Sequence, residues 1–257
     1  MGKPLKDWNI QINYGIKTGF NDAFIINGAK RQELISQDPK SAEIIRPILR
    51  GRDIKPYFYA FSDLYLIATF PSLKIDIEQF PAIKQHLLSF GYDRLKQTGE
   101  KGSRKKTNNK WFETQDSIGY WDLFYKQKIC WKAVGRNLTF ALVEPGIFLT
   151  APASFIYSDH NEYILAFLSS NVGKYFIYQN SDTTGAGDIM LNIQSLTKFP
   201  IPLPSKETVS EIKNKILNLL GNLKKGLPII NLQKEIDAYI YTLYEFNNEE
   251  VKFIESQ

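Results

Sequence analysis

Phe199-Pro200-Ile201-Pro202-Leu203-Pro204-Ser205 is the stretch at which the hydrophobic pattern of this 257-residue chain changes. Three prolines within five residues fit neither a helix interior nor a central strand, because proline lacks the backbone N–H that both hydrogen-bond ladders use. The stretch therefore predicts a rigid linker. It separates a predicted domain at residues 1–200 from predicted helices at residues 206–257.

Apolar residues in the second part recur at alternating spacings of three and four, which is typical of amphipathic helices. Gly226 and Pro228 interrupt the pattern, so two helices are predicted to form an antiparallel hairpin. Each spans only about two heptads, which is too short for a long coiled coil. Packing of these spacer-like helices on the preceding domain or on a neighbouring domain is favoured over a dimerisation role. The apolar positions are Val209, Ile212, Ile216, Leu219 and Leu223, and then Ile229, Leu232, Ile236, Tyr239 and Leu243.

The first part combines short strands with a few helices. Tyr65–Phe70 is an apolar run that stops at Pro71, as a buried strand does. Pro81–Phe90 has helical spacing and ends before Gly91. The chain is therefore predicted to have a mixed α+β fold, an α/β domain followed by the helical hairpin. Further predicted elements are paired strands at Lys128–Val134 and Leu138–Val143, a strand at Phe148–Tyr157 and a helix at Tyr163–Tyr178.

Composition limits the class of protein. Hydrophobic residues make up 43% and charged residues 23% of the chain, which is usual for a folded domain with its own core. Cys130 is the single cysteine, which excludes an internal disulfide and favours a reducing compartment. One cysteine and two histidines cannot build a zinc finger. Without an apolar run of about 18 residues or a signal peptide, the protein is expected to be cytoplasmic, with no membrane partner.

The sequence lacks the common catalytic motifs. It has no P-loop, no Asn-Pro-Pro-aromatic tetrad of amino-methyltransferases and no acidic-x-lysine nuclease motif. The glycine cluster at Thr183–Asp188 lacks the third glycine of a dinucleotide fingerprint and is interpreted as a flexible loop. Cys130 is expected to be buried, and His86 and His160 have no catalytic partner in sequence. The chain by itself is predicted to be no enzyme, with no cofactor or metal of its own. The alternative is a DNA methyltransferase or nuclease of an unfamiliar type.

Positive charge is concentrated in one segment. The net charge is +5, yet residues 94–110 alone carry seven Lys or Arg and one Glu. Such a segment indicates a polyanionic partner, although charge alone supports DNA binding and a solvated, disordered loop about equally. Lysines suit phosphates, Arg104 suits guanine, and asparagines suit adenine. Trp111 either stacks on a base or anchors the loop. The candidate DNA-binding residues here are Lys101, Arg104, Lys105, Lys106, Asn108, Asn109, Lys110 and Trp111.

Two other segments place cations beside glycines. They are Gly15–Asp22 and Arg50–Lys55, where exposed backbone amides and cations would suit a phosphate backbone. Taken singly, each is also typical of an ordinary turn with a charge. The candidate DNA-binding residues are Lys17, Thr18, Asn21, Arg50 and Arg52, together with Thr183 and Thr184 from the glycine cluster.

A series of motifs, in a fixed order, resembles a known family. The chain is similar to the target recognition domain of type IIG restriction–modification enzymes, the TaqI-like C-terminal specificity domain. That domain is itself similar to type I restriction specificity subunits. The resemblance covers nearly the whole chain. Its motifs are Tyr14–Ile26, Ile45–Ile54, Gly119–Leu123, Lys128–Trp131, Phe167–Ser170, Phe199–Pro202 and Ile236–Tyr244 with Asn248–Val251.

The resemblance implies a sequence-specific reader of double-stranded DNA. Such a module directs an adenine-specific methyltransferase and endonuclease held elsewhere, in the same chain or in a partner chain. S-adenosylmethionine and Mg are then expected only in those associated catalytic domains. Gly15, Gly19 and Gly51 are assigned to backbone geometry, and the nearby cations to DNA contact. A third interpretation is a protein-interaction module that uses the C-terminal helices.

Overall fold

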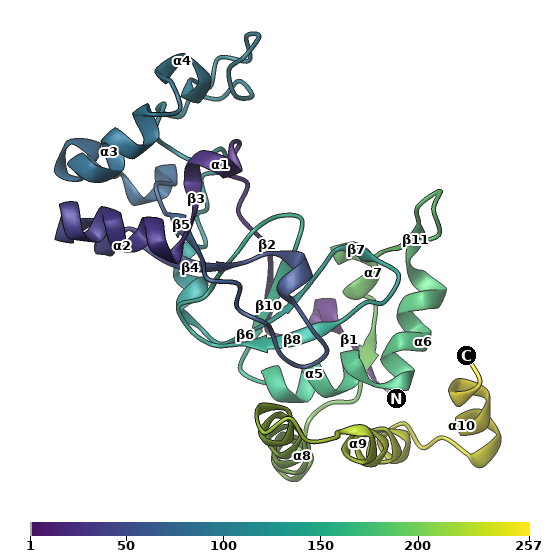
Figure 1. Cartoon of the computed structure of the whole chain (residues 1–257). Helices are drawn as coiled ribbons and strands as arrows, with labels where there is room; N and C mark the ends of the chain where they lie inside the picture. The colour runs from purple at the N-terminus through teal and green to yellow at the C-terminus, as the bar shows by residue number, and fades with distance from the viewer. Residues whose placement is uncertain (1) are drawn as a thin grey trace.

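The structure is a computed structural model that describes residues 2–257. It confirms a mixed α+β fold in which several small sheets are surrounded by helices (Figure 1). Among the described residues, no helix combines the length and the apolar character that crossing a membrane requires.

A four-stranded antiparallel sheet lies at the centre of the fold. Its strands follow the order β2-β10-β6-β8, and every residue of β6 and β8 is buried. That burial explains why both strands are mainly apolar runs rather than alternating apolar and polar ones. The predicted pairing of the two runs is confirmed, because Lys128 pairs with Val143. The strand bounds are β2 Ile10–Tyr14, β6 Lys128–Trp131, β8 Phe140–Val143 and β10 Ser154–Ser158.

A second sheet, in the order β3-β5-β4-β9, supports the lobe that carries the basic segment. Strands β4 and β9 are parallel, whereas the other pairs are antiparallel. A first hydrophobic core, which includes Phe24, Leu66 and Phe148, fills this lobe. Figure 1 shows α2, α3 and α4 at its outer side. The bounds are β3 Ile25–Asn27, β4 Ile45–Leu49, β5 Leu64–Ile67, β9 Phe148–Leu149, α1 Asn21–Phe24, α2 Gly28–Gln37, α3 Pro81–Leu88 and α4 Tyr92–Leu95.

The proline-rich stretch is partly a strand, which differs from the predicted linker. Pro200 and Ile201 form β13, which pairs with β1 (Lys3–Pro4) in a two-stranded sheet. A sheet of two strands consists only of edges, where a missing N–H is tolerated. Ile201 is fully buried, so this stretch is packed against the body.

The predicted helix at residues 163–178 is two helices. Helix α5 (Asn161–Ser169) ends before Ser170, and α6 (Asn171–Asn180) begins after it. Ser170 has extended backbone angles, and its hydroxyl accepts a hydrogen bond from the N–H of Gly173. The capping preference of serine therefore interrupts a hydrophobic pattern that would otherwise run on.

Helices follow the proline stretch, and three are present where the pattern predicted two. They are α8 (Lys206–Lys224), α9 (Ile230–Leu243) and α10 (Asn248–Glu255). Figure 1 shows α5 between the central sheet and the α8–α9 pair. A second core joins Ile156 and Phe167 to Ile212 and Ile240. This core continues across the proline stretch, and the division into domains at residue 200 stays a prediction.

Short elements complete the chain. A three-stranded sheet in the order β11-β12-β7 connects the turn after β6 to the glycine cluster. The remaining bounds are β7 Val134–Gly135, β11 Asp182–Thr183, β12 Ile189–Met190, α7 Ile193–Leu196 and the 3₁₀ helices Leu5–Asp7, Pro39–Glu43, Gly51–Asp53, Pro71–Leu73, Ile77–Gln79 and Trp121–Tyr125.

Lys128 at the start of β6 is a buried cation. Its ammonium donates hydrogen bonds to the carbonyl oxygens of Phe124 (2.9 Å), Lys126 (3.1 Å) and Glu144 (3.3 Å). Burial lowers the pKa of Lys128 to about 8. Because the unfolded chain then binds a proton more tightly than the folded one, the free energy of unfolding should rise with pH above this pKa.

We expect Lys128→Met to remove this pH dependence. Between pH 8 and 9.5 the wild type should gain about 1.5 kcal/mol of unfolding free energy relative to the variant. Urea denaturation at several pH values measures the difference. Lys126→Met, which changes an exposed ammonium two residues away, should keep the wild-type slope. Equal pH slopes for wild type and Lys128→Met would show that Lys128 titrates normally.

Candidate nucleic-acid interface

The two glycine–cation segments meet at one place in the fold. We call Gly15–Asp22 the first glycine loop and Arg50–Lys55 the second. The N–H of Ile16 donates to the carbonyl of Leu149 (2.7 Å), and the N–H of Thr150 donates to that of Leu49 (2.9 Å). Both loops therefore leave the sheets beside the same connection between β9 and β10.

Close packing explains the glycines of the first loop. A Cβ at Gly15 would lie 2.4 Å from the carbonyl carbon of Thr150, which is too short for any side chain. Gly19 has a φ of +78°, a conformation that glycine adopts readily. The geometric role that the sequence suggested for these two glycines agrees with this packing.

The basic segment is a folded loop, which we define as residues 96–115 and call the basic loop. Its backbone is closed by hydrogen bonds from Arg104 N to Lys96 O (2.8 Å) and from Thr107 N to Gln97 O (3.0 Å). The side-chain amide of Gln97 donates to the carbonyls of Lys110 (3.1 Å) and Glu113 (3.0 Å). These bonds give the loop a defined shape.

Arg104 is a buried residue that holds the backbone of the basic loop together. Its side chain is 2% exposed, and its guanidinium lies 5.0 Å from the ring centre of Phe24. Burial, with a smaller effect of nearby Arg94, lowers the pKa of Arg104 to about 10, so the group stays charged at neutral pH. The guanidinium donates to the carbonyl oxygens of Leu95 (2.8 Å), Thr18 (3.0 Å), Glu113 (2.8 Å) and Trp111 (2.6 Å).

These contacts correct the expectation that Arg104 reads guanine. A guanidinium that holds guanine N7 and O6 must present a free pair of N–H groups, and here four carbonyls occupy the fork. The bond to Thr18 also shows what Arg104 does instead. It fastens the basic loop to the first glycine loop, 86 residues away in sequence.

Three other candidates also turn inward. The amide of Asn109 donates to the carbonyls of Thr114 (3.0 Å) and Gln115 (2.9 Å), so its donors are unavailable to adenine. Thr18 is 1% exposed, and its hydroxyl donates to Asn21 Oδ1 (2.7 Å). Trp111 is half-buried and packs edge-on against the rings of Tyr92 and Phe112. The structure thus corrects the DNA-contact role predicted for Thr18 and Asn109, whereas that of Trp111 stays a prediction.

Most remaining candidates of these loops face solvent. Lys17 is exposed, and its carbonyl accepts a hydrogen bond from the N–H of Gln115 (3.2 Å), which places it beside the basic loop. The structure thus gathers charges from two distant segments into one surface. The exposed candidates are Lys17, Asn21, Arg52, Lys101, Lys105, Lys106, Asn108, Lys110 and Thr183, with Thr184 half-buried.

The second glycine loop is held by an ion pair. Arg50 donates to Asp53 through Nε (3.0 Å) and Nη2 (2.9 Å), and Ser62 donates to the same carboxylate (2.8 Å). Burial raises the pKa of Asp53, but the hydrogen bonds from Arg50 and Ser62 outweigh it, and the net pKa lies below the usual value. Arg50 is therefore largely engaged inside the protein, whereas Arg52 is exposed.

Lys132 joins this loop without having been suggested by the sequence. A Cβ at Gly51 would lie 3.2 Å from Lys132 Cβ, and one at Gly135 would lie 2.7 Å from its Nζ. Gly135 belongs to β7, which pairs with β12 of the Thr183–Asp188 hairpin. The sequence could have pointed to Lys132 through its position as the first cation after the buried strand β6. In Figure 1 this hairpin and the tip after α4 both lie on the side away from α8 and α9.

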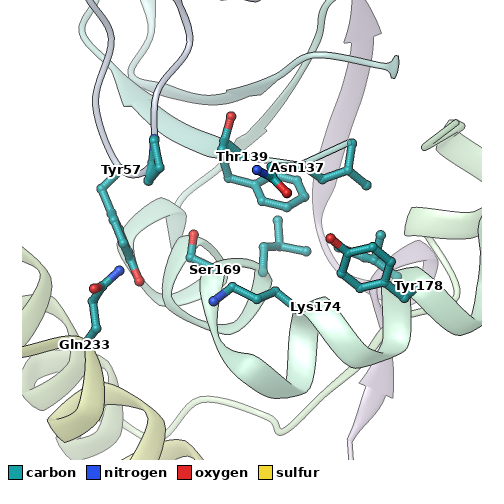
Figure 2. A pocket seen from close by; sticks show the side chains of 12 residues that line it. Tyr57, Asn137, Thr139, Ser169, Lys174, Tyr178 and Gln233 are labelled. Atoms are coloured by element: carbon teal, nitrogen blue, oxygen red, sulfur yellow. The ribbon is translucent and has the colours of Figure 1, made fainter. Parts of the chain in front are cut away.

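A cavity of about 340 Å³ lies behind the turn after β7 (Figure 2). The hydroxyls of Thr139 and Ser169 are buried there and have no hydrogen-bond partner among residues 2–257. The ammonium of Lys174 lies 3.4 Å from Asn171 Oδ1. The lining holds no carboxylate, histidine or cysteine. The labelled polar residues are Tyr57, Asn137, Thr139, Ser169, Lys174, Tyr178 and Gln233.

The surroundings of Cys130 and His86 are those of residues that support the fold. Cys130 is fully buried, as predicted, and burial raises the pKa of its thiol to about 12. His86 is half-buried beside the carbonyl oxygen of Ala23, 3.0 Å from its Nε2. Within the part of the chain that the structure describes, no three His, Cys, Asp or Glu side chains gather in a way that would hold a metal.

Known proteins resemble this chain in sequence and in fold. The chain is 25% identical over 252 residues to the type II methyltransferase M.MjaIV of Methanocaldococcus jannaschii, which covers 94% of this chain and 80% of that protein. The type IIL restriction–modification enzyme MmeI, solved in complex with DNA, has a TM-score of 0.65 and 12% identity over 99% of this chain. The type IIG restriction endonuclease BpuSI has a TM-score of 0.55 and 15% identity over 94% of this chain.

The chain spans only 37% of the MmeI chain and 31% of the BpuSI chain, and at these identities the likeness concerns the fold. Residues 46–201 match the model of the TaqI-like C-terminal specificity domain. This match contains the second glycine loop, the basic loop and strands β6, β8 and β10 of the central sheet. It confirms the resemblance that the ordered motifs predicted. Since the match covers more than half of its length, the chain belongs to the family of TaqI-like C-terminal specificity domains.

Proposed function

We propose that this chain reads the base sequence of double-stranded DNA for a restriction–modification enzyme. Methyl transfer to adenine and DNA cleavage are assigned to other domains, in the same chain or in a partner chain. S-adenosylmethionine and Mg would be held there. The membership of the family and the likeness of the fold to MmeI, which was solved in complex with DNA, support this role.

The structure of the basic loop is the observation that best supports this function. Its one internal arginine fixes the backbone, while four lysines of the same loop remain exposed. Exposed lysines neutralise phosphates and release counterions, which supplies affinity for any sequence. A folded loop loses less conformational entropy on binding than a disordered one. The four lysines are Lys101, Lys105, Lys106 and Lys110.

Base reading requires side chains with free hydrogen-bonding groups. Asn108 lies at the exposed surface of the basic loop, and its amide has no hydrogen bond within the described chain. An asparagine amide can bond adenine N6 and N7 together, a contact worth about 1–3 kcal/mol of discrimination. Asn108 therefore takes the role of base reader that Arg104 and Asn109 cannot fill.

Selection of bound duplexes from a randomised pool tests the function. We expect enrichment of a defined motif that contains at least one adenine position. Asn108→Ala should relax that position, whereas Lys105→Ala should weaken binding to all duplexes equally. Isothermal titration with S-adenosylmethionine should give no binding heat for this chain alone.

Three outcomes would count against the proposal. Recovery of the input pool without enrichment would show that no sequence is read. Binding of S-adenosylmethionine would favour the methyltransferase alternative. Self-association in light scattering, without any DNA affinity, would favour the protein-interaction alternative.

A further inference from the structure

Lys132 lies between two glycines, Gly51 and Gly135. It follows directly after β6, and a Cβ at Gly51 would lie 3.2 Å from Lys132 Cβ. A Cβ at Gly135 would lie 2.7 Å from both Cε and Nζ of Lys132. Glycine at that position therefore leaves the room that the ammonium occupies. The side chain of Lys132 forms no hydrogen bond or ion pair within residues 2–257.

Each of the two glycines is followed by an arginine. Arg52 is exposed, and its guanidinium has no acidic partner within 4.0 Å among the described residues. The side chain of Arg136 is 85% exposed, and its Nε lies 3.9 Å from Asp188 Oδ1, at the limit of an ion pair. By contrast, Arg50 is neutralised by Asp53. The packing of Lys132 against Gly51 and Gly135 thus makes Arg52, Lys132 and Arg136 neighbours at this junction, where Asp188 lies 3.9 Å from Arg136.

Like charges brought together without partners favour an anion between them. The high exposure of Arg136 indicates a ligand that lies on the surface, not one enclosed in a pocket. Such open cationic surfaces suit a polymer backbone, which they contact from outside. The exposed hydroxyl of Thr183 lies in the sheet that contains Gly135 and adds a neutral donor.

We propose that Arg52, Lys132 and Arg136 form a phosphodiester-binding site for duplex DNA, separate from the basic loop. The inference rests on the proposed function and adds a second contact to it. The connection between β9 and β10 lies beside both glycine loops. The duplex is therefore held by the basic loop on one side of this connection and by the new site on the other. This site positions the DNA and reads no base.

The salt dependence of duplex binding tests this site. Lys132→Gln removes the charge but keeps a stem that packs on both glycines. It should lower the log–log salt slope by about 0.9 and weaken binding of every duplex roughly five- to tenfold at 0.1 M salt. Lys132→Arg, which retains the charge, should keep the wild-type slope. Lys225→Gln, an exposed cation after α8, is the matched control.

The outcomes separate this site from the proposed function. A wild-type slope in Lys132→Gln, Arg52→Gln and Arg136→Gln, each folded by circular dichroism, would overturn the site while leaving DNA reading intact. Absence of duplex binding by the wild type would instead overturn the function itself. Loss of affinity for one sequence only would show that these residues read bases, which also contradicts the inference.

Discussion

Replacing Arg104 by methionine is expected to lower the free energy of unfolding by at least about 3 kcal/mol, because buried carbonyls lose their donor. The four acceptors come from three segments of the chain, so the basic loop and the first glycine loop should separate. Methionine keeps much of the buried volume, which limits the effect of a cavity. Urea denaturation followed by circular dichroism measures the loss.

Lys105→Met is the matched control, since it changes the adjacent cation at an exposed position. Substitution there should alter the unfolding free energy by no more than about 0.5 kcal/mol. Equal stability of the Arg104 and Lys105 variants would show that the guanidinium does not hold the basic loop to the first glycine loop. A variant at Arg104 that kept its stability but lost one base preference would restore the reading role.

Replacing the four exposed lysines of the basic loop by glutamine should produce the largest change in DNA binding. With about 0.9 units lost per phosphate contact, the log–log salt slope should fall by three to four units. The loss of affinity should then approach about a thousandfold at 0.1 M salt. Fluorescence anisotropy with one selected and one random duplex measures both quantities. Stability should change little, because none of these side chains is buried. The lysines are Lys101, Lys105, Lys106 and Lys110.

A control with the same charge change comes from α8 and the turn after it. Replacing Lys206, Lys213, Lys224 and Lys225 by glutamine lowers the net charge equally but on the opposite side of the molecule. If the basic loop contacts DNA directly, only the loop variant should show a smaller log–log salt slope. Equal losses in both variants would mean that net charge alone drives binding, and an unchanged loop variant would exclude the loop from the interface.

Local pattern was sufficient for most of the fold. The strand near Tyr65, the helix that begins at Pro81 and the pairing of β6 with β8 all follow from hydrophobic period and turn residues. Two of the differences between the predicted and the observed elements came from effects that hydrophobic periodicity does not contain. Ser170 caps a new helix, and Pro200 pairs with a strand near the N-terminus. The first is a competing local hydrogen bond, and the second depends on a segment almost 200 residues away.

The sequence by itself determined how much charge the basic loop holds and which family its motifs resemble. Only the tertiary structure decided which cation of that loop faces inward. Arg104 and Lys105 are neighbours of the same charge, yet one is 2% exposed and the other is exposed to solvent. The physical reason is that the acceptors of Arg104, above all the carbonyl of Thr18, are brought to it by folding. Lys132 likewise acquires its position from Gly51, a residue distant in sequence that packing places against it.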